Sequence, residues 1–123
     1  MKIVFAFKWA IIWAVCIFGL CIMNPSNLPS IEVNWDIGPD KFVHFSMFAV
    51  MSYTSIIGIR LNNWNHKTYW LAGIFSSLYG VGIEIIQGAF FAYRSFDYAD
   101  MLANTIGAMS ITLILFLKSN KAH

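Results

Sequence analysis

Four apolar segments, separated by short polar stretches, run along this chain. Each segment is close to the roughly 20 residues that an α-helix needs to cross the hydrocarbon core of a bilayer. A lone segment in lipid can satisfy its backbone hydrogen bonds only internally, as a helix does. The pattern therefore predicts an all-α fold, an integral membrane bundle of four transmembrane helices over residues 3–23, 42–60, 68–91 and 100–117.

The connections between the four segments are polar and rich in turn-forming residues. Pro25 and Pro29 end the first segment, residues 61–67 are rich in asparagine, and residues 92–98 form a short connection. No internal repeat, low-complexity tract or change of composition marks a second domain. The sequence thus predicts one membrane domain over residues 1–123.

The composition favours the same class of protein. Apolar residues make up 59% of the 123 positions and charged residues only 11%, whereas soluble domains average about a quarter charged residues. A soluble protein of this size has too much surface to leave so uncharged. The net charge is +2, and no run of basic residues indicates binding to nucleic acid. Cys16 and Cys21 lie on different sides of one predicted helix, which argues against a disulfide between them.

The basic residues indicate the orientation in the membrane, because cytoplasmic loops carry an excess of lysine and arginine. Four helices place both termini and the 61–67 connection on one side, with six basic residues against two on the other. We therefore expect a multi-pass membrane protein with cytoplasmic termini. The two groups are Lys2, Lys8, Arg60, Lys67, Lys118 and Lys121 on the first side, and Lys41 and Arg94 on the second.

Polar side chains gather near the outer ends of the second, third and fourth segments. Spacings of three or four positions put them on one face of each helix. Ionisable groups within a membrane are costly and pair with one another, so we expect the three polar faces to meet. These residues are Asp40, Lys41 and His44, then Glu84 and Gln87, and then Asp97, Asp100 and Asn104, with Arg94 in the preceding connection.

Three of these residues are candidate catalytic groups, namely His44, Glu84 and Asp100. His44 could act as a general base, a proton relay or a metal ligand. It could instead only hold helices together through hydrogen bonds to Glu84 or Asp100. Glu84 could be a general acid or base or a metal ligand, or it could be one half of a buried ion pair.

The other polar residues are candidates for ligand binding. No cofactor is required by the sequence, but the oxygen atoms of Glu84, Asp97 and Asp100 could hold a divalent metal ion. Asp97 and Asp100 could equally stabilise the start of the fourth helix, which is the better interpretation for Asp97. Arg94 could bind a phosphate or carboxylate group, or pair with a nearby aspartate. The predicted binding residues are Asp40, Lys41, Gln87, Arg94, Asp97 and Asn104.

The same residues form three motifs in chain order. They read D-K-x-x-H-F from Asp40, G-x-x-x-E-x-x-Q from Gly80, and R-S-x-D-x-x-D-x-x-x-N-x-x-G from Arg94. From about Asp40 to about Ser110 the chain resembles the VanZ-like family of bacterial membrane proteins. That family is named for a protein linked to resistance to the glycopeptide antibiotic teicoplanin. The resemblance therefore implies a multi-pass protein of the bacterial inner (cytoplasmic) membrane, a role in the cell envelope and a link to antibiotic resistance.

Several functions are compatible with these features. The first is a polar pocket that binds or acts on a cell-envelope component, with membrane lipid and a lipid-linked or peptidoglycan-related precursor as partners. The second is a small enzyme of the outer leaflet, in which His44 and Glu84 supply acid–base or metal chemistry while Lys41 and Arg94 hold a phosphate or carboxylate. The third is a purely structural polar network in a scaffold or transporter-like protein. A drug-efflux subunit fits less well, because its first helix would carry a carboxylate. The sequence leaves the oligomeric state open.

Overall fold

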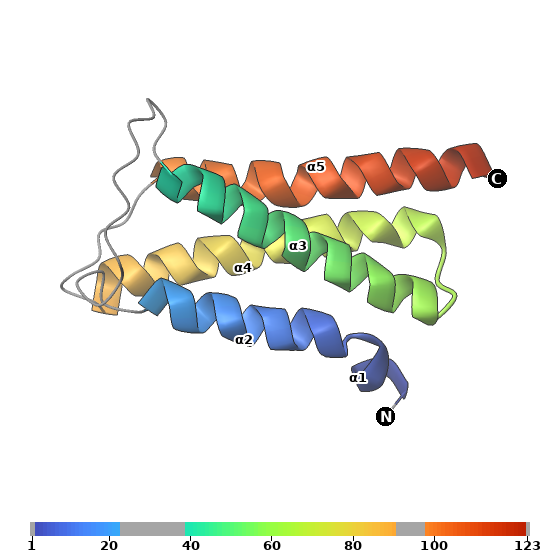
Figure 1. The fold of residues 1–123 in the computed structure, drawn as a ribbon, viewed down its shortest axis with the longest axis horizontal. Helices are drawn as coiled ribbons and strands as arrows, with labels where there is room; N and C mark the ends of the chain where they lie inside the picture. The colour runs from blue at the N-terminus through green and yellow to red at the C-terminus, as the bar shows by residue number, and fades with distance from the viewer. Residues whose placement is uncertain (1, 23–38, 91–97, 123) are drawn as a thin grey trace.

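The computed structural model of the chain describes residues 2–22, 39–90 and 98–122. Within these ranges every regular element is helical, which confirms the predicted all-α class. The elements are α1 (Lys2–Ala6), α2 (Lys8–Ile22), α3 (Pro39–Leu61), the 3₁₀ helix η2 (His66–Thr68), α4 (Tyr69–Phe90) and α5 (Tyr98–Ala122) (Figure 1).

Three stretches of the described chain are long and apolar enough to cross a membrane. They are Lys41–Leu61, His66–Phe90 and Tyr98–Lys121. At 1.5 Å per residue, the 22 residues of α4 extend about 33 Å, which matches a hydrocarbon core of about 30 Å. The structure therefore supports the second, third and fourth predicted spans, with bounds a few residues wider than expected for α3 and α5.

The first predicted span, 3–23, is not one helix in the structure. It is divided into α1 and α2 at Phe7, and the 15 residues of α2 extend only about 22 Å. The hydrogen-bond ladder nevertheless passes through the bend, since Phe7 N donates to Ile3 O (3.1 Å) and Ile11 N donates to Phe7 O (3.0 Å). Of the four predicted transmembrane helices, the described residues thus contain three that are long and apolar enough to cross a membrane, beside the shorter apolar helix α2.

A tertiary contact accounts for the bend at Phe7. The Phe7 ring lies so close to the backbone of Gly58 in α3 that a Cβ atom at position 58 would be 2.4 Å from it. The same ring lies 5.8 Å from the Trp64 ring. Turning the chain at Phe7 lets this ring pack against α3, and α1 then turns away from the axis of α2 (Figure 1).

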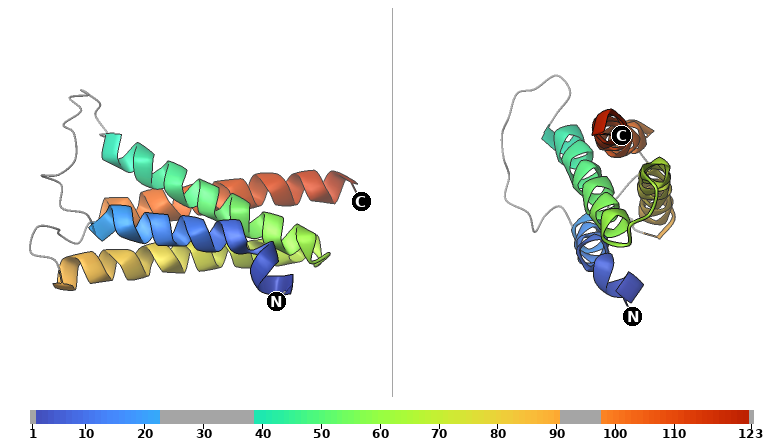
Figure 2. Two further views of the ribbon diagram at one scale, coloured as in Figure 1. Left: turned by 60° about the horizontal axis from the view of Figure 1, so that its bottom comes forward. Right: turned by 90° about the vertical axis from the view of Figure 1, so that its right-hand side faces the viewer.

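The helices alternate in direction along the chain. Both described chain ends and the α3–α4 connection lie at one end of the bundle, and the beginnings of α3 and α5 lie at the other, together with the end of α4 (Figures 1 and 2). Consequently α3 and α5 run parallel, although α4 separates them in sequence. Their backbones approach closely, because an added Cβ at Gly107 of α5 would lie 2.2 Å from the carbonyl oxygen of Phe45 in α3.

Helix α2 is attached to this three-helix unit through both apolar packing and polar contacts. Ile17 and Cys21 of α2 are buried in one cluster with Phe48, Ile83 and other side chains of α3 to α5. Trp13 Nε1 donates to the carbonyl oxygen of Met47 (2.8 Å). The Tyr79 hydroxyl of α4 donates to the carbonyl oxygen of Ala14 (2.6 Å). These contacts fix α2 against both α3 and α4. 

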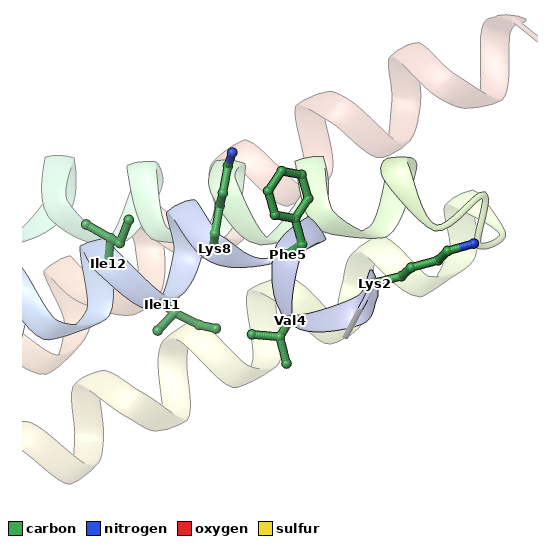
Figure 3. Close-up of a pocket in the computed structure, with 6 residues that line it drawn as sticks. All are labelled: Lys2, Val4, Phe5, Lys8, Ile11 and Ile12. Carbon is green, nitrogen blue, oxygen red and sulfur yellow. The ribbon is translucent and has the colours of Figure 1, made fainter.

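The outer surface of the helices is apolar, as expected for side chains that face lipid. A shallow concave region over α1 and the start of α2 belongs to this surface (Figure 3). In it, Lys8 and Phe5 point to the same side, and the Lys8 Nζ lies 4.1 Å from the centre of the Phe5 ring. The aromatic ring offers this ammonium group a partner at the surface of the helix. The concave region is distant from the polar residues described next.

Candidate functional site

Five of the predicted polar residues converge at the end of the bundle where α3 and α5 begin and α4 ends (Figure 1). Because α3 and α5 are parallel, their first turns lie at the same depth. Because α4 is antiparallel to both, its last turns reach that depth as well. The five residues, described below in order of increasing depth, are Lys41, Asp100, His44, Asn104 and Glu84.

Lys41 and Asp100 form an ion pair at the entrance to this group. The Lys41 ammonium donates to Oδ1 of Asp100. The Lys41 side chain is 21% exposed and the Asp100 side chain 12% exposed, so this pair still reaches the edge of the bundle. Asp100 lies in the first turn of α5, where the helix dipole also favours a negative charge.

His44 lies one turn deeper and bridges two residues of α5. Its Nδ1 is 2.9 Å from Oδ1 of Asn104, and its Nε2 is 3.6 Å from Oδ2 of Asp100. An amide oxygen only accepts hydrogen bonds, so Nδ1 is the donor to Asn104. His44 and Asn104 are 5% and 1% exposed. The spacing of Lys41 to His44 on α3 and of Asp100 to Asn104 on α5 brings these side chains together across the interface.

Glu84 contributes the α4 side of the group and is completely buried. One ligand atom each from His44, Glu84 and Asp100 lies within 4.8 Å of the other two. A histidine nitrogen and two carboxylates are therefore adjacent in an environment shielded from water. Such an arrangement can transfer protons, hold a cation or form a charged lock between three helices.

Small residues allow this close convergence. A Cβ atom at Gly80 would lie 3.0 Å from Nδ2 of Asn104 and 3.0 Å from the ring of Phe48. The absence of a side chain at Gly80 thus leaves space for Asn104 beside α4. Gly107 has the same role between α5 and α3. Both glycines belong to the motifs recognised in the sequence.

The remaining predicted site residues are placed differently. Gln87 is buried, but its Nε2 donates to the backbone carbonyl oxygen of Cys21 in α2, so it fastens α2 to α4. Asp40 belongs to the first turn of α3. Arg94 and Asp97 lie outside the described residues. Of the predicted oxygen ligands for a metal ion, Glu84, Asp97 and Asp100, the described residues therefore include Glu84 and Asp100. His44 lies close to both.

The structure contains a second polar layer, between α3 and α5, that the sequence analysis did not predict. The hydroxyl groups of Ser52 and Thr112 are 2.7 Å apart and fully buried, and Thr112 also donates to the carbonyl oxygen of Ala108. Ser52 lies eight positions after His44, and Thr112 lies eight positions after Asn104. Extending the two polar stripes along their helix faces would have identified this pair.

The charged residues in the described part of the chain are divided between the two ends of the bundle. Lys41 and the three acidic residues Asp40, Glu84 and Asp100 belong to the end that holds the polar cluster. The opposite end carries basic residues only: Lys2, Lys8, Arg60, Lys67, Lys118 and Lys121. At this end Arg60 Nε donates to the Tyr69 hydroxyl (3.0 Å).

A family model described as VanZ/LLP1 matches residues 5–119, which is nearly the whole chain and includes α2 as well as the three motifs. Neither a curated protein nor a solved structure shows significant similarity to the chain.

Proposed function

This chain belongs to the VanZ/LLP1 family, and from that premise we propose that it binds the polar headgroup of a cell-envelope component at the outer ends of α3, α4 and α5. The component is a lipid-linked or peptidoglycan-related molecule within reach of the membrane. The earlier resemblance to the VanZ-like family supports a connection to glycopeptide resistance, teicoplanin in particular.

One observation carries this proposal: the polar groups form a gradient of burial from the end of the bundle inward. Lys41 stays partly exposed, Asp100 is 9% exposed, and His44, Asn104 and Glu84 below them are 5%, 1% and 0% exposed. A lysine ammonium at the entrance attracts phosphate and carboxylate groups. The buried groups beneath it offer hydrogen-bond donors and acceptors in a medium where each such contact is strengthened.

The orientation in the membrane is part of the same proposal. We place the basic end of the bundle in the cytoplasm, following the bias of lysine and arginine toward that side. The polar cluster then faces the outer leaflet of the cytoplasmic membrane. In this proposal the segment Lys2–Ile22 crosses as a fourth span, since all of its residues except Lys2 and Lys8 are apolar or small and α2 lies along α3 and α4 (Figure 2).

A second candidate function is an enzyme that acts on the same component. It is favoured by the orientation of His44, whose Nδ1 is held by Asn104 while Nε2 faces the carboxylate of Asp100. A histidine beside the carboxylates of Asp100 and Glu84 supplies the kinds of group that general acid–base catalysis uses. In that case the protein converts the bound component, and the product accumulates with time.

Mass spectrometry of lipids that co-purify with the protein in native nanodiscs tests the binding proposal. We expect enrichment of a phosphate-containing envelope lipid over the surrounding membrane, and loss of that enrichment in Lys41→Gln. The control is Lys67→Gln, which removes an exposed charge of the same sign from the opposite end. Teicoplanin susceptibility of cells that express each variant should follow the lipid enrichment.

Two results would contradict the proposal. One is a wild-type lipid composition identical to that of the bulk membrane. The other is equal enrichment in wild type and Lys41→Gln, which would leave the cluster with a structural role. Incubation of the enriched lipid with wild type and Glu84→Gln separates binding from catalysis, because only an enzyme yields a new product that the variant fails to form.

A further inference from the structure

We propose that His44, Glu84 and Asp100 form a binding site for a single divalent transition-metal ion of the Zn²⁺ class, with Asn104 orienting the histidine. This inference rests on the geometry of the cluster and holds whether or not the headgroup proposal does.

The distances between the ligand atoms fit a shared ion. The Nε2 of His44 and Oδ2 of Asp100 are 3.6 Å apart, which is too far for a hydrogen bond. Two ligands with bonds of about 2.1 Å at a tetrahedral angle are about 3.4 Å apart, close to the observed distance. The corresponding atom of Glu84 completes a group whose members all lie within 4.8 Å.

The hydrogen bond between His44 and Asn104 prepares the histidine for this role. Because Nδ1 donates to Oδ1 of Asn104, Nε2 is the ring nitrogen that remains for a metal ion, and it faces the Asp100 carboxylate. Histidines that bind metals commonly donate their other ring nitrogen to an oxygen in this way.

The charges of the cluster are compatible with a cation. Asp100 uses its two oxygens separately: Oδ1 accepts from Lys41, and Oδ2 faces His44. Lys41, Glu84 and Asp100 together carry one more formal negative charge than positive charge. Burial makes a charged Glu84 costly without positive charge nearby. A divalent ion among the three ligands supplies positive charge, and the net formal charge of these residues with the ion then favours an anionic headgroup.

The donor atoms indicate the kind of ion. One imidazole nitrogen favours Zn²⁺ and related transition metals over Mg²⁺ and Ca²⁺, which prefer all-oxygen ligands. Three protein ligands leave one position of a tetrahedral Zn²⁺ site open. That position is available to water or to a phosphate or carboxylate oxygen.

Metal analysis of the full chain tests this site. The protein is purified in detergent with a tag free of histidine, stripped with EDTA, exposed to Zn²⁺ and passed through a desalting column. We expect one Zn²⁺ per chain by elemental analysis, and a raised thermal unfolding midpoint compared with the stripped protein. With Co²⁺ as the probe, we expect the visible absorption bands of a tetrahedral site.

Variants assign the signal to the proposed ligands. His44→Ala and Glu84→Gln should reduce bound Zn²⁺ at least tenfold and abolish the Co²⁺ bands. His66→Ala is the matched control, since His66 lies in η2 at the opposite end of the bundle, and it should bind as wild type does.

The wild-type protein alone can overturn the proposal, so the test survives a variant that fails to fold. Stripped wild type that takes up no stoichiometric Zn²⁺, shows no Co²⁺ band and keeps the same unfolding midpoint would contradict it. In that case the cluster is an ion-paired lock between helices. Zn²⁺ that is lost in His66→Ala but kept in His44→Ala would contradict it as well.

Discussion

A methyl group added at Gly107 should separate α3 from α5. Its Cβ atom would lie 2.2 Å from the carbonyl oxygen of Phe45 and 2.9 Å from the carbonyl carbon. Contacts below 3.0 Å essentially never occur for a Cβ, so the helices would have to move apart by at least about 0.8 Å. The clash is with backbone atoms, and therefore no change of side-chain rotamer relieves it.

The cost follows from three terms. Overpacking of a well-packed interior costs about 1–3 kcal/mol. The movement also lengthens the hydrogen bonds His44–Asn104 and Ser52–Thr112, and interhelical hydrogen bonds in membranes contribute about 0.6 kcal/mol each. The higher helix propensity of alanine returns about 1 kcal/mol. We therefore expect Gly107→Ala to lower the free energy of unfolding by about 2 kcal/mol.

Reversible unfolding in mixed detergent micelles, followed by circular dichroism, measures this change. Gly82→Ala is the matched control, because a Cβ at Gly82 meets nothing within 4 Å. It should leave stability unchanged or raise it by up to about 1 kcal/mol. If Gly107→Ala and Gly82→Ala unfold at the same denaturant concentration, the close α3–α5 contact is refuted.

Two further predictions concern α2 and the topology. Tyr79→Phe removes the hydrogen bond to Ala14 O but keeps the ring. It should therefore lower the free energy of unfolding by about 0.5–1.5 kcal/mol in the same assay. A decrease above about 3 kcal/mol would contradict this local role. The topology is tested by introducing Lys121→Cys into a cysteine-free background. This cysteine should react with a membrane-impermeant maleimide in inverted vesicles but not in intact cells. Labelling in intact cells would reverse the proposed orientation.

The long helices could be predicted from the sequence because each of them depends on its own run of apolar residues. The polar stripe of each helix could be predicted for the same reason. His44 lies three positions from Lys41, and Asn104 lies four positions from Asp100, so each pair shares a helix face without knowledge of the neighbours. The requirement that polar groups in a membrane find partners then indicates that these faces meet.

The parts that escaped prediction depend on contacts between distant segments. Gln87 is three positions from Glu84, which suggests the same cluster, yet the two side chains face different neighbours because α4 packs against α2 as well as α5. No proline or glycine near Phe7 indicates the bend in the sequence. It depends on the packing of the Phe7 ring against Gly58 in α3. The sequence of the first segment alone cannot predict that contact.

The pairing of parallel helices α3 and α5 has a consequence for biogenesis. Helices are synthesised in chain order, so Lys41, His44 and Glu84 reach the membrane before Asp100 and Asn104. The Lys41–Asp100 and His44–Asn104 contacts can form only after the last helix has entered. Until then the bilayer holds ionisable groups at a cost of up to a few kcal/mol each. The final helix therefore supplies the partners of Lys41 and His44, and its entry stabilises the helices that precede it.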